Sequence, residues 1–594
     1  MHCFSIRRIC FCTLLATLAA TQGVAQQISD ITPPPSAAAV SPGGVNYQYG
    51  SFEYSREWLT VGSGDFPAQM SFRTTYSSSA DSRLSPLGKT SHNWGASLYR
   101  VAIDKTPGPY PSDWICATYI SVGNRSDSFE KVGCGNAGNY DYGLYRGATL
   151  EFAANAFLYT MKNGGTATFP SSEFALYVAL DKWTEPDGTQ FTFGYANGKL
   201  ASVFSNRGYG FIFENGTSTT KVCAVSLAKD FLVNGSLCPA GAPAVTITLT
   251  SGNVSSILDA TGGTWTFQYS PNTTTRMTCY KEPGSSACRV ANSWQPAGDD
   301  KTGRVGSQRF ADGTSLAYGY QSSRNALPTD PDPWLYFNHQ TTVTDGSGAV
   351  TQLGVGGGNS GMLPIWVQDP LLRRTDLTYA ADESLSDIKY PESNEIVMLF
   401  DDRYNPTERR QKPKPGSALA DIVTQASYPA SSGTIGMFPK CTYPKSCNRA
   451  SSVTDARGNT TNYTFDNVHG GMLTETRPAV NGVRPQVRYE YAQRYAWIKN
   501  SGGTYSQAAS PVWLLVRERF CRTTAASGQS CAGGAADEVI TDYDFGPNSG
   551  PNNLFLRGKA IAADGVTLRS CYSYDAYGRR ISETRPNANL ATCP

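Results

Sequence analysis

The C-terminal end of the chain reads Tyr572-Ser573-Tyr574-Asp575-Ala576-Tyr577-Gly578-Arg579-Arg580-Ile581-Ser582-Glu583-Thr584-Arg585-Pro586. A degenerate copy at residues 463–478 has Phe465-Asp466 in the place of Tyr574-Asp575 and also ends in Glu-Thr-Arg-Pro. The aspartate and the glutamate are 8 positions apart in the C-terminal copy and 9 in the upstream copy, as expected for a turn with one inserted residue. A strand–turn–strand pattern that occurs twice in the sequence predicts a repeat architecture.

A shorter half-motif recurs beyond about residue 180. It consists of Asp-Gly-Thr, or a looser version, followed by two aromatic residues that flank a single residue. Asp-Gly favours a tight hairpin turn, because Gly accepts positive φ and Asp hydrogen-bonds nearby backbone. The alternation then puts every ring on one face of a strand, and stacked repeats join these faces into a buried wall. The half-motif occurs at residues 187–195, 259–269, 312–320, 455–463 and 564–574.

The composition also indicates β-structure. Charged residues make up 16% of the 594 residues, whereas Gly (58), Pro (35) and Tyr (33) are plentiful. Few charges together with many turn-forming and strand-favouring residues argue against long helices. The predicted fold class is therefore all-β, with one β-hairpin after another.

The first 25 residues are typical of an export signal. Arg7 and Arg8 supply positive charge, residues 9–20 form a mostly apolar run, and Gly23-Val24-Ala25 offers small residues for cleavage. The run is too short for a membrane span, and no later stretch approaches the ~18 apolar residues that a span needs. We therefore expect no transmembrane segment and a secreted, periplasmic or cell-surface protein. A leader rich in Pro, Ser and Ala follows at residues 26–44.

The mature chain carries no net charge. Removal of the signal takes two arginines from the 50 basic residues and leaves 48, equal to the 48 acidic ones. This balance argues against nucleic acid or an anionic membrane as the main partner.

Twelve of the 15 cysteines lie outside the signal and fall into six local pairs. An even number of clustered cysteines in an exported chain is typical of disulfides that close hairpins or loops. Zinc is the competing interpretation, but the chain has no Cys-x-x-Cys spacing and only three histidines after the signal. Proximity along the chain predicts the disulfides Cys116/Cys134, Cys223/Cys238, Cys279/Cys288, Cys441/Cys447, Cys521/Cys531 and Cys571/Cys593.

The Tyr-Asp-x-x-Gly-Arg core formed by Tyr574, Asp575, Gly578 and Arg579 resembles a YD repeat of the Rhs (rearrangement hotspot) family. Half-repeats from about residue 184 to the end extend the resemblance over most of the chain. Residues 45–105 are similar to the β region that precedes such arrays. The residues that carry this second similarity are Leu59-Thr60-Val61-Gly62, Phe66-Pro67-Ala68, Phe72-Arg73-Thr74-Thr75-Tyr76-Ser77-Ser78, Leu87-Gly88 and Asn93-Trp94-Gly95.

The resemblance implies a β-repeat strip at residues 181–594 that curls into a solenoid or partial shell, with a cysteine-containing β insertion at 106–180 before it. In full-length relatives such a shell encloses a C-terminal toxin, which self-cleavage at the repeat boundary releases. The Asp-Pro-x-Gly boundary marker is missing, because Asp330-Pro331, Asp332-Pro333 and Asp369-Pro370 are not followed by x-Gly. The sequence therefore predicts a shell without a toxin or an autoproteolytic site of its own.

Candidate catalytic residues are few. His92, His339 and His469 stand in no recognisable catalytic pattern and are expected to be surface or turn residues. Gly358-Asn359-Ser360-Gly361 does not complete a Gly-x-Ser-x-Gly nucleophile turn, because Met362 occupies the last position. We therefore predict no catalytic residue.

A cation site formed by carboxylates is an alternative to their role in turns and strands. Asp401-Asp402 with Glu408 contains suitable oxygen ligands, but neighbouring residues of a strand face opposite sides of a sheet. The recurring Asp of the half-motif is expected to serve the turn, with calcium as the alternative. No metal site and no cofactor are predicted.

The function predicted is that of an exported, non-enzymatic scaffold that forms a β-repeat shell or a surface for interactions. One alternative is a module that binds carbohydrate or protein through rim loops such as residues 107–114. Another is the shell of a toxin-delivery system, with the toxin or a further Rhs polypeptide as its partner. A hydrolase within residues 106–180 is the enzymatic alternative.

Overall fold

The computed structural model describes residues 40–593 except for 81–84, 104–114, 124, 133–146, 172–176, 233–236, 272, 297–302, 325–335, 358–361, 436–437, 529 and 589. Within these ranges every regular element is a β-strand apart from a 3-10 helix at Pro586–Ala588, so the all-β fold class is confirmed. No helix in the described part of the chain is long and apolar enough to cross a membrane. The predicted signal and nearly all of the leader lie outside the described residues.

One long antiparallel sheet runs through most of the chain, and its strands pair in chain order. They are β7 (Thr149–Ala153), β8 (Ala156–Thr160), β9 (Thr166–Pro170), β11 (Lys182–Thr184), β12 (Gln190–Ala196), β13 (Lys199–Ser205), β14 (Tyr209–Asn215), β15 (Thr219–Ser226), β16 (Ala244–Thr250), β17 (Asn253–Leu258), β18 (Thr264–Ser270), β19 (Thr273–Lys281), β20 (Val290–Trp294), β21 (Val305–Phe310), β22 (Ser315–Arg324), β23 (Tyr336–Asp345), β24 (Val350–Gly357), β25 (Met362–Gln368), β26 (Arg374–Tyr379), β27 (Leu385–Lys389), β28 (Glu395–Phe400), β29 (Pro406–Lys412), β30 (Ile422–Ser427), β33 (Ser452–Thr454), β34 (Thr460–Phe465), β35 (Met472–Thr476), β36 (Gln486–Arg494), β39 (Val512–Cys521), β42 (Glu538–Asp544), β43 (Gly558–Ala563), β44 (Val566–Tyr574) and β45 (Arg580–Glu583).

The remaining strands form smaller sheets. A three-stranded sheet has the order β1-β2-β3, and a four-stranded sheet has the order β10-β4-β5-β6. Three short hairpins, β31–β32, β37–β38 and β40–β41, form separate two-stranded sheets. Their bounds are β1 (Glu53–Gly62), β2 (Gln69–Ser77), β3 (Thr90–His92), β4 (Ala96–Ile103), β5 (Ile115–Val122), β6 (Arg125–Val132), β10 (Tyr177–Ala179), β31 (Gly433–Ile435), β32 (Phe438–Lys440), β37 (Trp497–Lys499), β38 (Tyr505–Gln507), β40 (Ala526–Ser527) and β41 (Ser530–Cys531).

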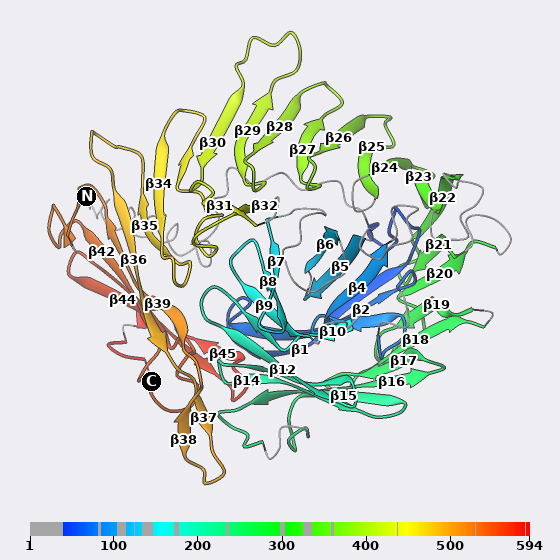
Figure 1. Ribbon diagram of the computed structural model, residues 1–594, viewed down its shortest axis with the longest axis horizontal. Helices are drawn as coiled ribbons and strands as arrows, with labels where there is room; N and C mark the ends of the chain where they lie inside the picture. Colours follow the sequence, from blue (N-terminus) through cyan, green and yellow to red (C-terminus); the bar gives the residue numbers. More distant parts are fainter. Residues whose placement is uncertain are drawn as a thin grey trace, which may run out of the picture.

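The long sheet begins at Thr149, inside the segment 106–180 that the sequence analysis treated as an insertion. Strands β7 to β9 pair with one another, and β9 pairs with β11, so they continue the repeats without a break. Only β5, β6 and β10 of that segment belong to a different sheet. Figure 1 shows the long sheet curving round the N-terminal strands β1, β2 and β4 to β6.

Most of the recurring aspartates cap their own turns, as the sequence predicted, whereas the carboxylate of Asp564 accepts hydrogen bonds from Arg522. Asp575 Oδ1 accepts the N–H groups of Tyr577 at 2.9 Å and Arg579 at 3.0 Å, and its Oδ2 accepts Arg579 Nε at 2.6 Å. Such bonds satisfy backbone donors that the turn leaves without a strand partner. A carboxylate that accepts the N–H two residues ahead is also found at Asp187, Asp259, Asp312, Asp345, Asp369, Asp382, Asp401, Asp455, Asp466 and Asp544.

A second recurring contact, which the sequence pattern did not indicate, involves a tyrosine hydroxyl on the second strand of a hairpin. In four hairpins this hydroxyl donates to the carbonyl 15 residues earlier, on the partner strand or just before it. The donors and acceptors are Tyr195 and Leu180 (3.0 Å), Tyr269 and Val254 (2.8 Å), Tyr320 and Val305 (2.8 Å), and Tyr379 and Pro364 (2.7 Å). Tyr574 makes the equivalent bond to Leu556 at 2.7 Å, whereas Phe465 of the degenerate copy has no hydroxyl.

The aromatic face of the long sheet packs against the N-terminal region. The main hydrophobic core contains buried residues from β1 and β2 together with those of β7 to β23. Figure 1 shows these N-terminal strands inside the curve of the sheet. Ring pairs connect the two layers, among them Trp58 with Trp265, Phe72 with Phe213, Tyr76 with Tyr269, and Trp94 with Phe191, at centroid distances of 5.7, 5.8, 6.0 and 5.2 Å.

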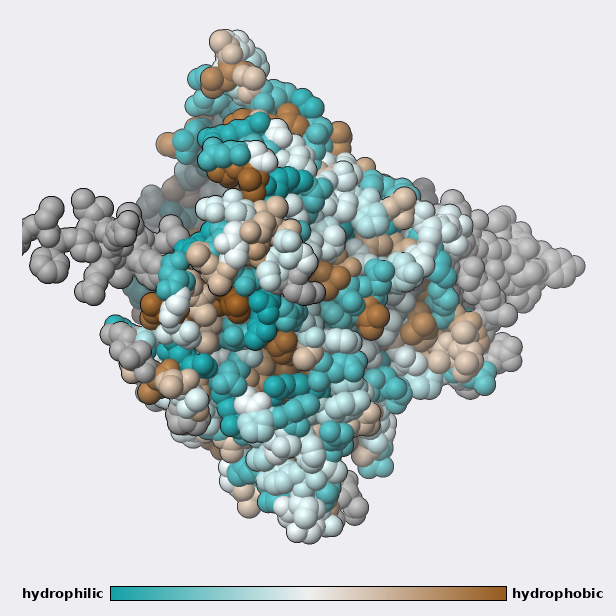
Figure 2. Space-filling model, turned by 90° about the vertical axis from the view of Figure 1, so that its left-hand side faces the viewer, coloured by the Kyte–Doolittle hydropathy of each residue, from teal (hydrophilic) through white to brown (hydrophobic). Residues whose placement is uncertain are grey.

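The outward surface of the last third of the sheet is mostly polar. Figure 2 looks onto the side of the molecule that holds β34 to β36 and β42 to β44, where hydrophilic residues dominate and apolar ones are scattered. Single exposed apolar residues are normal on a protein surface and need no partner. The two faces of the sheet therefore differ: the aromatic face is turned toward the N-terminal region, and the outward face is more polar.

Replacing Tyr320 by phenylalanine tests the tyrosine–carbonyl bond. Tyr320 is 5% exposed, so the lost hydroxyl leaves its carbonyl partner short of a donor in the core. We expect Tyr320→Phe to lower the free energy of unfolding by about 1 kcal/mol, measured by urea denaturation. Tyr443→Phe, at a residue that is 52% exposed, is the control and should leave the midpoint unchanged. Equal midpoints for the wild type and both variants would contradict a stabilising hydrogen bond between Tyr320 and the carbonyl of Val305.

The turn aspartates also predict a pH dependence. Side-chain donation from Arg373, followed by backbone N–H bonds, lowers the pKa of Asp369, and Asn459 has the same effect on the pKa of Asp455. A lowered folded-state pKa gives stability that is complete above the unfolded value of about 4 and is lost as pH falls through the folded value.

The urea midpoint of the wild type should therefore fall as the pH is lowered from about 5 to about 2. The double variant Asp369→Asn/Asp455→Asn should start with a lower midpoint at neutral pH and show a shallower decline. A decline of equal steepness in both proteins would mean that these carboxylates do not contribute.

Candidate functional site

The beginning of the long sheet meets the last third of the chain along a line of contacts that we call the seam. Backbone bonds define it, because each joins segments far apart in the sequence. The donors are the N–H groups of Gly62, Lys499 and Trp513, and the acceptors are the carbonyls of Tyr577, Leu227 and Asp187, each at 2.8 Å. The bonds of Lys499 and Trp513 join the last third of the chain to the first hairpins of the long sheet, and the bond of Gly62 joins β1 to the C-terminal repeat.

The C-terminal repeat forms one end of the seam. The hydroxyl of Tyr577 accepts a hydrogen bond from Lys229 Nζ at 2.7 Å, and the same ammonium lies 4.6 Å from the centre of the ring. Gly578 has φ +81°, and a Cβ atom there would lie 2.5 Å from Phe555 and 2.8 Å from the Cα of Gly62. The motif glycine is therefore required both by the turn and by the close approach of β1.

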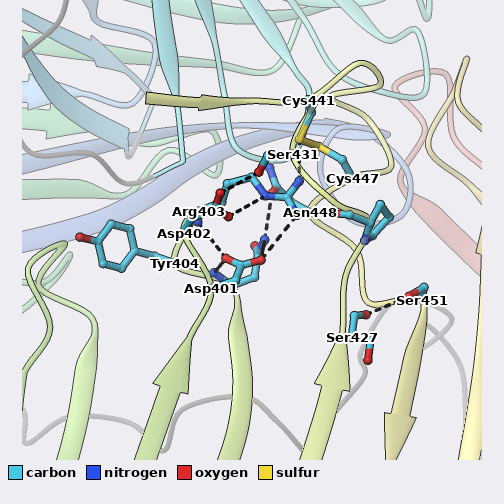
Figure 3. A network of polar contacts seen from close by, with 12 residues as sticks. Asp401, Asp402, Arg403, Tyr404, Ser427, Ser431, Cys441, Cys447, Asn448 and Ser451 are labelled. Carbon is cyan, nitrogen blue, oxygen red and sulfur yellow. Dashed lines mark hydrogen bonds and ion pairs between the residues drawn. A yellow bond between two sulfur atoms is a disulfide. The ribbon is translucent and has the colours of Figure 1, made fainter. Parts of the chain in front are cut away.

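The middle of the seam is a buried arginine network, shown in Figure 3. The side chain of Arg403 is 2% exposed. Its Nη1 donates to Cys441 Sγ at 2.7 Å, and its Nη2 donates to the carbonyl of Pro429. The carboxylates of Asp401 and Asp402 lie 3.5 and 3.8 Å from the guanidinium. Burial of this cation is tolerable only because two carboxylates and a carbonyl surround it.

The arginine network continues to the first hairpins of the sheet. Lys162, in the turn between β8 and β9, donates from Nζ to the carbonyl of Tyr404 at 2.9 Å. The Asn448 side chain donates to the carbonyl of Lys162 at 2.9 Å and accepts from Asn405 at 3.0 Å. Burial lowers the pKa of Lys162 from its ordinary value, with Asp382 and Asp401 acting in the opposite direction.

The disulfide loop Cys441–Cys447 makes further contacts across the seam. Lys445 Nζ donates to the carbonyls of Pro186 at 3.1 Å and Val468 at 2.8 Å. Gly164 lies against the same loop with φ +84°, and a Cβ there would come within 2.5 Å of the Cα of Lys445. One short loop thus joins the turns before β9, β12 and β35.

The carboxylates considered for a cation do not converge. Asp401 accepts from its own turn, Asp402 accepts from Ser431 Oγ at 2.9 Å, and Glu408 pairs with Arg410 at 2.7 Å. Donors already occupy these oxygens, so the arrangement suits turn and strand stabilisation.

The two histidines with described side chains are packed against rings. His469 accepts the Gly471 N–H on Nδ1 at 3.1 Å and lies 4.5 Å from the rings of both Tyr491 and Trp513. His92 lies between Phe72 and Phe213, at 5.9 and 5.3 Å. Burial lowers the pKa of His469 and lowers that of His92 to about 4, so both are neutral at neutral pH. The side chain of His339 and residues 358–361 lie outside the described residues.

Five of the six predicted cysteine pairs are joined by disulfides: Cys223–Cys238, Cys279–Cys288, Cys441–Cys447, Cys521–Cys531 and Cys571–Cys593. The side chains of Cys116 and Cys134 lie outside the described part. Asp537 is close to Cys521 and Cys531, a combination that can hold a metal. Here the sulfurs are bonded to each other, and the carboxylate accepts hydrogen bonds from Thr523 and Thr524.

Sequence reasoning missed most of the seam. The contacts of Lys162 with Tyr404 and Asn448 join segments more than 200 residues apart. Those of Arg403 with Pro429 and Cys441 join residues 26 and 38 positions apart. The only local sign was the short spacing of Cys441 and Cys447, which correctly indicated a constrained loop but not what the loop contacts.

The chain is thus an all-β protein of hairpin repeats closed along a seam. No family model matches it, and none of the curated proteins matches it either. Among solved structures, the Tc holotoxin pore of Photorhabdus luminescens with a mutated TccC3 covers 81% of the chain at 10% identity, with a TM-score of 0.32.

The structure of TcdB2-TccC3 without its hypervariable C-terminal region covers 97% of the chain at 11% identity, with a TM-score of 0.33. The chain spans only 27% and 32% of these two solved chains. A porin-like protein from Bacteroides uniformis covers 71% of the chain at 7% identity and a TM-score of 0.11, and 97% of its own length is matched.

Arg403 provides the mutational test of the seam. We expect Arg403→Ala to lower the free energy of unfolding by about 3 kcal/mol, because it removes a buried guanidinium and its contacts with Cys441, the carbonyl of Pro429 and the half-buried Asp401. Arg373→Ala is the matched control, since Arg373 also pairs with an aspartate of its turn but is 62% exposed. That exposed pair should contribute less than about 1 kcal/mol in urea denaturation. Equal losses for the two variants would show that the Arg403 network does not hold the seam.

Proposed function

We propose that the chain is an exported β-repeat scaffold of the Rhs/YD type, which acts as a shell and has no catalytic activity of its own. The observation that carries this proposal is the seam. A sheet that only presented binding loops would not need contacts such as those of Lys229 with Tyr577 and Asp187 with Trp513, which join its first hairpins to its last third.

The positions of the repeat motifs support the YD assignment. The Asp of the motif caps the turn, its Gly makes the close approach at the seam, and its Tyr bonds to a carbonyl of the neighbouring chain segment. Each motif residue therefore has a role in a curved strip of hairpins, which we propose is a solenoid-like shell. The same reasoning assigns no residue to catalysis.

The disulfides support export. Five bonds within the described residues are typical of proteins that fold in an oxidising compartment. We propose that the protein is secreted, periplasmic or displayed at the cell surface. The partner proposed is a toxin or a further Rhs polypeptide carried on another chain, and a carbohydrate- or protein-binding surface is the alternative function.

A protease-protection experiment tests the shell. The mature chain is produced together with the polypeptides encoded beside its gene, and the purified complex is treated with proteinase K. A shell protects its partner, so the partner should survive in the complex and be cleaved when alone. In a complex made with Arg403→Ala the protection should decrease, and with Arg373→Ala it should persist.

Two results would contradict the shell. One is a partner that binds stably but is cleaved as fast in the complex as in isolation. The other is the absence of any bound polypeptide when the wild-type chain is folded and oxidised, as judged by its unfolding midpoint and its lack of free thiols.

A further inference from the structure

Three exposed tyrosines lie next to one another on the four-stranded sheet. The strand register pairs Tyr177 of β10 with Tyr99 of β4, and Tyr99 with Tyr119 of β5. Their exposed fractions are 54%, 43% and 46%, among the highest of the large aromatic residues in the described chain. We call these three residues the tyrosine row.

The two faces of this sheet differ sharply. The residues adjacent to the tyrosine row along the strands, Leu98, Ile120 and Val178, point to the opposite face and are at most 5% exposed. That opposite face belongs to the main core. Paired residues on neighbouring strands are about 5 Å apart, so the tyrosine row presents three rings over a length of about 10 Å.

A row of Ala179 and three serines runs beside the tyrosine row. Two positions away along each strand, the register pairs Ala179 with Ser97, Ser97 with Ser121, and Ser121 with Ser126. Tyr119 itself pairs with Ser128 on β6. Because side chains alternate along a strand, these residues share the face of the tyrosine row. The two rows contain rings and hydroxyls and no charged side chain, and Glu130 of β6 lies on the same face two residues beyond Ser128 along the strand.

The chemistry of this face distinguishes among partners. Nucleic acids and acidic peptides are bound chiefly through Lys and Arg, which the two rows lack. A lipid surface requires a wide apolar patch with cationic residues around it. Flat phenol rings flanked by serine hydroxyls suit a ligand with apolar C–H faces and many hydroxyl groups, namely a chain of uncharged sugars.

We propose that Tyr99, Tyr119 and Tyr177 form a binding site for a neutral polysaccharide, with successive sugar rings stacked on the tyrosine row. The neighbouring serines exchange hydrogen bonds with the sugar hydroxyls. This site lies outside the repeats and outside the seam, on the four-stranded sheet that Figure 1 shows within the curve of the long sheet.

Affinity electrophoresis tests the site. The mature wild-type chain is run through native gels that contain glucomannan, hydroxyethylcellulose, laminarin or dextran, and the dissociation constant of any retarding polymer is then measured by calorimetry. We expect at least one polymer to retard the wild type. Tyr99→Ala and Tyr119→Ala should each weaken binding roughly three- to tenfold, because each removes one stacking ring.

Two control variants separate stacking from general damage. Tyr119→Phe keeps the ring and should retain most of the affinity, whereas Tyr443→Ala removes an equally exposed tyrosine from the disulfide loop and should bind as the wild type does. Unfolding midpoints equal to that of the wild type establish that the variants are folded.

The proposal is overturned if no polymer retards the folded wild type, or if the double variant Tyr99→Ala/Tyr119→Ala is retarded as strongly. If no polymer retards the wild type and the double variant also loses the polypeptide partner of the protease-protection experiment, the tyrosine row is a contact site for that polypeptide.

Discussion

A single layer of β-hairpins with aromatic rings on one face is unstable in water until something covers that face. In this chain the N-terminal region provides the cover, with Trp58, Phe72 and Trp94 in contact with the rings of the first repeats. Burial of one such side chain contributes about 1.5–3 kcal/mol, so the many ring contacts outweigh any single polar network. The curvature of the sheet follows, because only a curved sheet can surround its cover.

The polar contacts of the seam have a different role. A buried cation such as Arg403 costs desolvation free energy, and its carboxylate and carbonyl partners offset that cost only when the geometry is correct. The network therefore favours one alignment of the β28–β29 turn with the first hairpins of the sheet over others, while the hydrophobic core supplies most of the stability. Gly164 and Gly578 add a steric condition, since a side chain at either position would collide with the opposite segment.

Local features of the fold could be predicted from the sequence, and long-range ones could not. The Asp-Gly turns, the alternation of rings and five cysteine pairs depend on residues within about two dozen positions of one another, and all are found in the structure. The start of the sheet at Thr149 was not predicted, because β7 to β9 lack the Asp-Gly-Thr signal. The tyrosine–carbonyl bond was also missed, although its constant spacing of 15 residues could have revealed it. Contacts such as Lys162 with Tyr404 depend on how the whole sheet curves, which no local pattern encodes.

The central claim is that the long sheet closes on itself along the seam, and amide hydrogen exchange at three residues tests it most directly. The N–H groups of Gly62, Lys499 and Trp513 donate to carbonyls across the seam rather than to a neighbouring strand. If the seam is closed, these amides exchange slowly, at rates comparable with those of the sheet. If all three exchange as fast as the amides of exposed turns while the strands stay protected, the sheet is an open strip and the account is wrong.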